Sequence, residues 1–261
     1  MSQPAERRRV RLLGGDVDIV TPAQVLAFAQ ARVEGGGRAV VANHNAHSLF
    51  LIRRSAELRA FFAQADLIQI DSTPMIHWGR LLGLPLHRGL RSTYLDWRED
   101  FWRLASERGW RVFYLGSAPG VAKTAVARLS AKWPGVQLAQ HDGYFDIAPG
   151  SPDNQAVLDE IAAFDPDILL VGMGMPRQET WILHNRAALK RGVIFSVGAA
   201  FDYEADVQKT PPRWTGRLGV EWLARLVNEP RRLAYRYLVE PWSLLGPALA
   251  DVGAALSRQP R

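Results

Sequence analysis

The chain has 261 residues, of which 48% are hydrophobic and 22% are charged, and it carries a formal net charge of +6. This composition is typical of one large globular domain, or of a domain with an appendage, and it excludes an intrinsically disordered chain. Because the chain contains no cysteine, disulfide scaffolds, thiolate metal sites and thiol nucleophiles are excluded, and a reducing compartment is favoured.

Six short apolar runs recur along the chain, each followed by a small or polar residue and then by a helical pattern. They are Arg38–Ala42, Leu67–Ile70, Arg111–Leu115, Val136–Ala139, Ile168–Val171 and Val193–Val197. Continuous apolar strands that alternate with helices are typical of a mostly parallel sheet covered on both faces. The sequence therefore predicts a Rossmann-like α/β fold.

Helix starts and the end of the strand pattern divide the chain. Thr21-Pro22-Ala23-Gln24 is a capping box, and Thr73-Pro74 begins a further helix. Beyond Ala205 the pattern predicts two amphipathic helices, Trp214–Val227 and Arg231–Leu245, separated by a proline. We expect an α/β body over residues 1–206 and a helical appendage over residues 207–261.

The appendage carries most of the positive charge. Residues 207–261 contain nine Lys and Arg against four Asp and Glu, interleaved with tryptophan and tyrosine. This combination suits an anionic membrane surface or a nucleic acid, and it also suits an ordinary solvated helical face. The best apolar run, Leu244–Leu256, is too short to span a bilayer and is interrupted by Asp251. Met1–Arg11 lacks the apolar region of a secretory signal, so we expect a cytoplasmic protein.

Ligands of an open parallel sheet bind beyond the carboxyl ends of its strands. Asn43 and Asn45 follow the first predicted strand, where amides can bind a sugar, although capping explains one of them. His44 and His47 have the spacing of a metal pair but lack a third ligand, so we predict no metal site. Asp71 directly follows the second strand, where it is suited to act as a general base or as a capping residue.

Two glycine-containing loops follow later strands. Gly116-Ser117-Ala118-Pro119-Gly120 leads into a helix, and its backbone amides favour phosphate, but the glycine that a P-loop needs directly before lysine is absent. Gly172 and Gly174 let a ligand approach the backbone, whereas Arg177 replaces the third glycine of the dinucleotide fingerprint. A nicotinamide cofactor is disfavoured. Arg177 or Gln178 can contact ribose, sugar or phosphate, and the alternative is a plain strand-to-helix turn.

The last predicted strand ends in Gly198-Ala199-Ala200-Phe201-Asp202, which puts Asp202 at the same rim. No Gly-x-Ser-x-Gly motif is present, so an α/β-hydrolase is unsupported. Asp165-Pro166-Asp167 has the form of an Asp-x-Asp metal motif but precedes a strand, at the wrong end of the sheet. We interpret it as a turn and predict no cofactor.

These segments, in this order, resemble the WecG/TagA/CpsF family of bacterial glycosyltransferases from about Leu12 to Leu238. The most specific parts are Ala65–Asp71, Gly172–Trp181, Gly198–Asp202 and Pro212–Arg232. The resemblance implies an inverting transferase that moves a sugar from UDP to a polyprenyl-diphosphate-linked sugar, in the biosynthesis of a surface polysaccharide or exopolysaccharide.

The resemblance also implies roles for individual residues. Asp71 matches the family's proposed base, and Asn45, Arg88 and Gln178 match its pocket residues. Tyr144 and Asp202 match positions near the nucleotide. In the family the appendage binds the membrane and brings arginines to the site, and the candidates here are Arg213, Arg217, Arg225, Arg231 and Arg232.

The chain departs from the family's usual pattern at two pocket positions. Asn43 stands where threonine is usual, and Ser72 stands where glycine usually follows the aspartate. The variant Asp71-Ser72-Thr73-Pro74 is more similar to the branch that contains the β-1,4-glucosyltransferase of xanthan assembly. The resemblance therefore implies glucose as the donor sugar, and N-acetylmannosamine or a uronic acid is the alternative.

The physical chemistry agrees with this resemblance. Loss of UDP leaves negative charge on a diphosphate, which arginines and helix-end amides can stabilise. Because the acceptor's lipid lies in the bilayer, a basic and aromatic appendage would hold the protein peripherally at the inner face of the cell membrane. We expect no nucleic-acid partner. A non-catalytic basic protein that binds RNA is the rival from another class, and a Rossmann oxidoreductase is a further rival.

Overall fold

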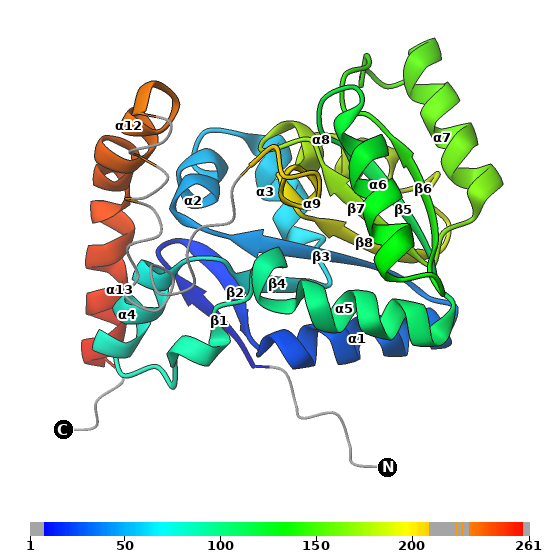
Figure 1. Cartoon of the computed structure of the whole chain (residues 1–261). Coiled ribbons are helices and arrows are strands. Elements are labelled where there is room, and N and C mark those ends of the chain that lie inside the picture. The colour runs from blue at the N-terminus through cyan, green and yellow to red at the C-terminus, as the bar shows by residue number, and fades with distance from the viewer. Residues whose placement is uncertain (1–7, 209–222, 224–225, 227–229, 258–261) are drawn as a thin grey trace.

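The computed structural model describes residues 8–208, 223, 226 and 230–257. Its main sheet has six parallel strands in the order β4-β3-β8-β7-β5-β6. The strands are β3 (Arg38–His44), β4 (Leu67–Ile70), β5 (Arg111–Gly116), β6 (Gln137–His141), β7 (Ile168–Gly172) and β8 (Gly192–Ser196). All six predicted strands are confirmed, and so is the α/β fold (Figure 1).

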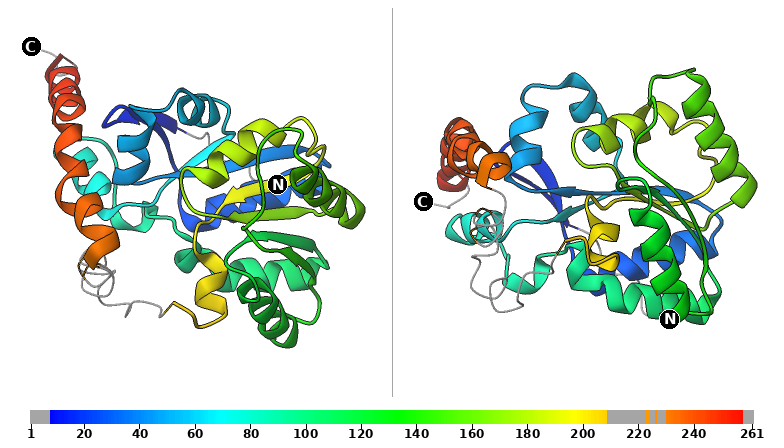
Figure 2. Two further views of the ribbon diagram at one scale, coloured as in Figure 1. Left: turned by 90° about the horizontal axis from the view of Figure 1, so that it is seen from above. Right: turned by 45° about the horizontal axis from the view of Figure 1, so that its top comes forward.

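Helices cover both faces of the sheet, as Figure 2 shows. One face packs against α2 (Ala46–Ile52), α3 (Ala56–Ala63), α7 (Pro152–Phe164) and α8 (Arg177–Asn185). The other packs against α1 (Pro22–Glu34), α5 (Tyr94–Arg108), α6 (Val121–Lys132) and α9 (Ala200–Glu204). Every residue of β7 and β8 is buried, because apolar side chains that point to both faces enter a core on each side. This burial explains why the strands read as continuous apolar runs.

The predicted helix starts are present. Thr21 caps α1: its hydroxyl accepts from the N–H of Gln24 at 3.2 Å, and its own N–H donates to Gln24 Oε1 at 2.8 Å. Helix α4 (Thr73–Leu81) begins with proline in its first turn. It is followed by the short 3₁₀ helix η1 (Arg88–Leu90). Helix α4 begins three residues after β4 ends, so the residues between them lie at the carboxyl-end edge of the sheet.

An antiparallel hairpin that the sequence analysis did not predict precedes α1. Its strands are β1 (Arg8–Leu12) and β2 (Gly15–Ile19). Asp18 attaches the hairpin to the body, because its carboxylate accepts from Arg9 at 2.9 and 2.8 Å and from the N–H of Ile68 at 2.8 Å. The hairpin therefore lies beside β4.

The C-terminal region differs from the prediction. The single helix expected over Arg231–Leu245 is wrong: the structure has α12 (Pro230–Leu238), the 3₁₀ helix η2 (Glu240–Leu244) and α13 (Leu245–Ser257). Pro241 has no N–H to continue the helical hydrogen bonds, which explains the break. Helix α13 was not predicted. The predicted helix Trp214–Val227 lies outside the described residues, apart from 223 and 226.

Helices α12 and α13 lie along one side of the body, beside α2 and α4 (Figure 1). Within the described residues, no helix combines the length and apolar character needed to cross a bilayer. We use the name appendage for α12, η2 and α13 from here on. The predicted boundary near residue 207 falls just after α9, immediately before the undescribed stretch.

Candidate active site

A cavity of about 460 Å³ lies between the carboxyl ends of β3 and β4 and the appendage. The body lines it with Asn45, His47, Asp71, Ser72, Trp78 and Arg91, among others. The appendage lines it with Arg236, Tyr237, Pro241, Leu244, Leu245 and Ala248. We call it the Asp71 cavity. It joins polar groups at the sheet edge to an apolar wall contributed by the C-terminal helices.

Strand pairing brings the two predicted residues Asp71 and Asn45 together. His44 pairs with Ile70 in the parallel ladder, and the N–H of Asp71 donates to the carbonyl oxygen of His44 at 2.9 Å. The side chains then meet, because Asn45 Nδ2 donates to Asp71 Oδ2 at 3.4 Å. The carboxylate that ends β4 therefore lines a cavity beside an amide, as a general base requires.

The capping alternatives resolve differently for these two residues. Asn45 is the N-cap of α2, and its Oδ1 accepts from the N–H of Ser48 at 3.1 Å. Its Oδ1 thus caps the helix while its Nδ2 contacts the carboxylate. Helix α4 has Ser72 as its N-cap residue and no side-chain cap bond. Asp71 precedes this N-cap residue and is not itself the N-cap of α4.

An arginine from the loop after α4 lines the cavity, and it is Arg91 in place of the predicted Arg88. Its backbone forms a bridge with Ile70, and its Nη2 donates to Asp96 Oδ1 at 2.8 Å. Arg88, the predicted residue, is exposed in η1 and does not line the cavity. Sequence reasoning missed Arg91, because nothing local in the loop indicates which arginine lies against the end of β4.

Two buried or partly buried acids attach the appendage to the body. His47 Nδ1 lies 2.6 Å from Glu240 Oε2. Asp251 Oδ2 accepts from the N–H of Leu13 at 2.7 Å and from Trp78 Nε1 at 3.0 Å. Burial, together with the charge of Arg236, lowers the pKa of His47 below its usual value, and the contact with Glu240 opposes this shift. These contacts hold the apolar wall over Asp71.

The structure describes only some of the arginines that were predicted to reach the site from residues 207–261. Arg213, Arg217 and Arg225 lie outside the described residues, as does the side chain of Arg232. Arg231 is exposed on α12. Among the described appendage arginines, Arg236 lines the Asp71 cavity, and the sequence analysis did not single it out.

Gly116 and Gly172, at the ends of β5 and β7, allow these two neighbouring strands to pack closely. Gly116 and Gly172 are partners in the ladder. A Cβ on Gly116 would lie 2.4 Å from the carbonyl oxygen of Gly172, and one on Gly172 would lie 2.3 Å from the hydroxyl of Tyr114. Side chains are excluded at both positions because neighbouring protein atoms already fill the space.

Gln178 and Arg177 are engaged within the protein. Gln178 is buried, and its Oε1 accepts from the N–H of Gly174 at 3.2 Å and of Gly198 at 3.1 Å. Arg177 donates to the carbonyl oxygens of Gly143 and Phe145. Both side chains therefore fix loops at the carboxyl-end edge of the sheet, and neither lines the Asp71 cavity.

The remaining predicted contacts lie along the same edge without lining that cavity. Asn43 Nδ2 donates to the carbonyl oxygen of Ser196 at 3.3 Å. The side chain of Tyr144 is 75% exposed. Asp202 is half-buried in α9. Tyr144, Asp202 and the glycine loops follow the ends of β5 to β8, and Asn43 lies at the end of the neighbouring β3. This part of the edge stays the predicted nucleotide region.

Comparison with known proteins agrees with the architecture. The family model described as the glycosyl transferase WecG/TagA/CpsF family matches residues 10–255. The chain belongs to this family. It is 26% identical over 235 residues to proteins of Staphylococcus aureus strains MW2 and COL, each named N-acetylglucosaminyldiphosphoundecaprenol N-acetyl-beta-D-mannosaminyltransferase. Each match covers 86% of this chain and 87% of the relative.

Membership of the family confirms that the chain is a glycosyltransferase. The predicted class of enzyme and its α/β architecture are therefore both correct, and the Rossmann oxidoreductase is disfavoured. The xanthan-type branch is not tested by these relatives and stays a prediction.

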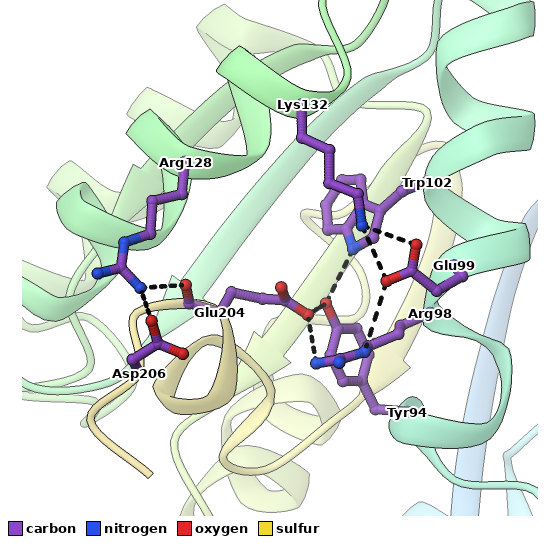
Figure 3. Close-up of polar contacts among 8 residues, drawn as sticks. All are labelled: Tyr94, Arg98, Glu99, Trp102, Arg128, Lys132, Glu204 and Asp206. Carbon is purple, nitrogen blue, oxygen red and sulfur yellow. Dashed lines mark hydrogen bonds and ion pairs between the residues drawn. The ribbon is translucent and has the colours of Figure 1, made fainter. Parts of the chain in front are cut away.

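In this glycosyltransferase a polar network fixes α9, the helix that carries Asp202 (Figure 3). Glu204 Oε1 accepts from the hydroxyl of Tyr94 at 2.8 Å and from Arg98 Nη1 at 3.3 Å. The same hydroxyl accepts from Trp102 Nε1 at 2.9 Å. Burial and then the charge of Glu204 raise the pKa of Tyr94 well above its usual value. The network ties α9 to α5 immediately before the chain leaves the body.

The residues with metal-like spacing have structural partners instead. His44 is fully buried, its Nδ1 lies 2.8 Å from Ser48 Oγ, and burial lowers its pKa to about 3. Asp167 Oδ2 accepts from the N–H of Arg111 at 2.9 Å, so this carboxylate has a structural partner at the amino end of β5. Across the described parts of the chain, no three His, Asp or Glu side chains gather in a way that would hold a metal ion.

Proposed function

We propose that this glycosyltransferase moves a sugar from a UDP-sugar to a polyprenyl-diphosphate-linked sugar, with inversion at the anomeric carbon. The observation that carries the proposal is the Asp71 cavity, in which a carboxylate at the sheet edge faces an apolar wall of the appendage. The names of the relatives support the acceptor class, since they specify an N-acetylglucosaminyldiphosphoundecaprenol acceptor.

The lining of the cavity suits such an acceptor. Arg91 and Arg236 bring positive charge for a diphosphate, and guanidinium groups bind phosphate oxygens through paired hydrogen bonds. Trp78, Leu244 and Leu245 provide an apolar surface for the first part of the lipid. The sugar of the acceptor would then lie at the polar end, beside Asp71.

Asp71 acts as the general base in this proposal. The acceptor hydroxyl attacks C1 of the donor sugar, its proton passes to the Asp71 carboxylate, and the bond between C1 and the UDP oxygen breaks. UDP leaves with the electron pair. Asn45, 3.4 Å from Asp71 Oδ2, holds the carboxylate in place. Positive side chains and helix-end amides stabilise the charge on the departing diphosphate.

The outer side of the appendage supports a peripheral position at the inner face of the membrane. Large apolar residues are exposed at helical spacing, namely Tyr235, Leu238, Val239, Trp242, Leu245, Leu249 and Leu256. An exposed apolar stripe next to basic residues is typical of helices that lie in a membrane interface. Replacing Trp242 and Leu249 by glutamate should abolish vesicle binding. If that variant sedimented with vesicles as the parent does, the membrane proposal would be wrong.

For the donor we propose glucose, and N-acetylmannosamine or a uronic acid is the alternative. Ser72, one of the two positions that depart from the family pattern, lines the Asp71 cavity. The relatives' names favour N-acetylmannosamine. One assay separates these three donors: a panel of UDP-sugars is offered with a short-chain prenyl-diphosphate-linked sugar.

That assay also tests the proposed function as a whole. We expect transfer from one class of UDP-sugar, an inverted anomeric configuration by NMR, and loss of transfer in Asp71→Asn. Transfer with retained configuration would contradict the single displacement. Salt-sensitive RNA binding without transfer or vesicle binding would favour the rival RNA-binding protein.

A further inference from the structure

A second cavity, of about 810 Å³, lies on the flank of α13 away from the Asp71 cavity. The body lines it from the β1–β2 turn, the end of α2, and α3. The appendage lines it with Pro247, Ala250, Asp251 and Ala254. We call it the arginine cavity, because Arg11, Arg53 and Arg59 are among its lining residues. Nothing in the proposed transfer reaction uses it.

Among the described residues, the charges around the arginine cavity leave two guanidinium groups without an acidic partner. Asp251 already accepts from two N–H groups, and Asp16 lies 3.5 Å from Arg11. Arg59 Nη1 donates to the carbonyl oxygen of Ile52 at 2.8 Å, which leaves its other donors available. Within the part of the chain that the structure describes, no carboxylate forms an ion pair with Arg53 or Arg59. Such guanidinium groups suit a phosphate.

The mouth of this cavity opens beside the apolar outer side of α13. Asp251 is the one charged residue of the helix, and it is turned toward the body. The exposed residues of α13 up to Leu256 are Leu245, Gly246, Leu249, Ala250, Gly253, Ala254 and Leu256. Ala250 and Ala254 belong both to this exposed side and to the cavity lining. A membrane that contacts the exposed side would bring its lipid headgroups to the cavity mouth.

We propose that the arginine cavity binds the phosphate group of an anionic membrane phospholipid, with Arg53 and Arg59 as its ligands. The proposal rests on the membrane association proposed above and is independent of the donor, the acceptor and Asp71. The phosphate enters beside Ala250 and Ala254, while the acyl chains stay with the apolar side of α13. A bound lipid would therefore fix how the transferase is oriented on the bilayer.

Vesicle partitioning tests the proposal with the full-length protein. Vesicles of phosphatidylcholine are compared with vesicles that also contain phosphatidylglycerol, for the parent, Arg53→Ala, Arg59→Ala and a control, Arg54→Ala. Arg54 is adjacent in the chain and exposed, but its guanidinium packs over Phe50 at 3.8 Å and does not line the cavity. It reports the effect of removing one positive charge from the same surface.

A cation near an anionic surface contributes about 1 kcal/mol, so Arg54→Ala should weaken binding to the anionic vesicles about five-fold. Loss of a charge-assisted hydrogen bond adds to this, so Arg53→Ala and Arg59→Ala should each weaken binding about fifty-fold. Binding to neutral vesicles should stay the same. Equal losses for Arg53→Ala, Arg59→Ala and Arg54→Ala would overturn the site and leave only general surface attraction.

A variant that fills the cavity gives an independent measurement. Ala254→Phe changes no charge, but its ring would occupy the cavity, so it should reduce the ratio of anionic to neutral vesicle binding. Because the ring also adds apolar surface, total binding should be kept. An unchanged ratio would contradict the proposal. Inorganic phosphate should compete only weakly, and a tight, Arg53-dependent complex with inorganic phosphate alone would mean a free-anion site in place of a lipid site.

Transfer to a short-chain acceptor dispersed in detergent separates this proposal from the proposed function. Arg53→Ala should keep parental transfer under those conditions, because no bilayer is present. If the parent transfers no sugar at all, the proposed function fails while the vesicle comparison still decides the lipid site.

Discussion

Asp251 attaches α13 to the body, and Asp251→Ala tests whether the appendage is held over the candidate active site by this carboxylate. The change removes two hydrogen bonds, from the Leu13 N–H and from Trp78 Nε1. A hydrogen bond to a charged group contributes about 1.5–3 kcal/mol. Because Asp251 is only partly buried, water replaces part of each bond. We therefore expect a loss of roughly 2 kcal/mol in the docking of α13, about a thirty-fold change in its opening equilibrium.

Hydrogen exchange measured by mass spectrometry follows this docking directly. Peptides from 245–257 should exchange about thirty-fold faster in Asp251→Ala, whereas peptides from β5 and β7 should be unchanged. Asp251→Asn, which keeps an acceptor oxygen, should recover part of the protection. Asp16→Ala is the control, since it removes an exposed carboxylate from the neighbouring strand β2. Unchanged exchange over 245–257 in Asp251→Ala would refute the reasoning.

Three further changes have directions that the structure sets. Asp71→Asn should lower kcat by about 10²–10⁴-fold with an unchanged Tm, because it removes the base and keeps the shape; near-parental kcat would exclude Asp71 as the base. Tyr94→Phe removes the bonds to Glu204 and from Trp102 and should cost about 1–3 kcal/mol in urea unfolding, while Tyr144→Phe, at an exposed position, should not. Burial raises the pKa of Glu179 from 4.5 to about 7. The contribution of its protonated form to the free energy of unfolding is therefore complete below pH 4.5 and is lost as the pH rises through about 7. Glu179→Gln should flatten this dependence of the unfolding free energy on pH, and an unchanged slope would contradict the assignment.

The sheet was predictable because buried parallel strands have a strong local signal. All six apolar runs are strands. The central ones, such as β7 and β8, bury both of their faces. The β1–β2 hairpin lacked the usual turn sequence, since its turn uses Leu13 and Gly14, both at positive φ. The break at Pro241 has a local cause, a proline without an N–H, which the sequence analysis did not use. The course of α13 depends on contacts of Asp251 with Leu13 and Trp78, which no local pattern records.

The candidate site was predictable where it follows from strand ends. Asp71 and Asn45 end neighbouring parallel strands, so the topology alone brings them together. Arg91, Arg236 and Trp78 reach the same cavity through long-range packing, and sequence reasoning missed them. Gln178 and the glycines show where the sequence was insufficient. Their motif indicates that something approaches the backbone closely, but it does not distinguish a ligand from a neighbouring loop of the protein.

Helix α13 is a wall of both cavities, and this shared wall links acceptor binding to membrane binding. Its Leu245 and Ala248 line the Asp71 cavity, and its Ala250 and Ala254 line the arginine cavity. A phospholipid held on one flank restricts the helix, and an already restricted helix loses less conformational freedom when the acceptor binds on the other flank. An anionic bilayer should therefore lower KM for the lipid-linked acceptor more than it changes kcat, and Arg53→Ala should remove this effect.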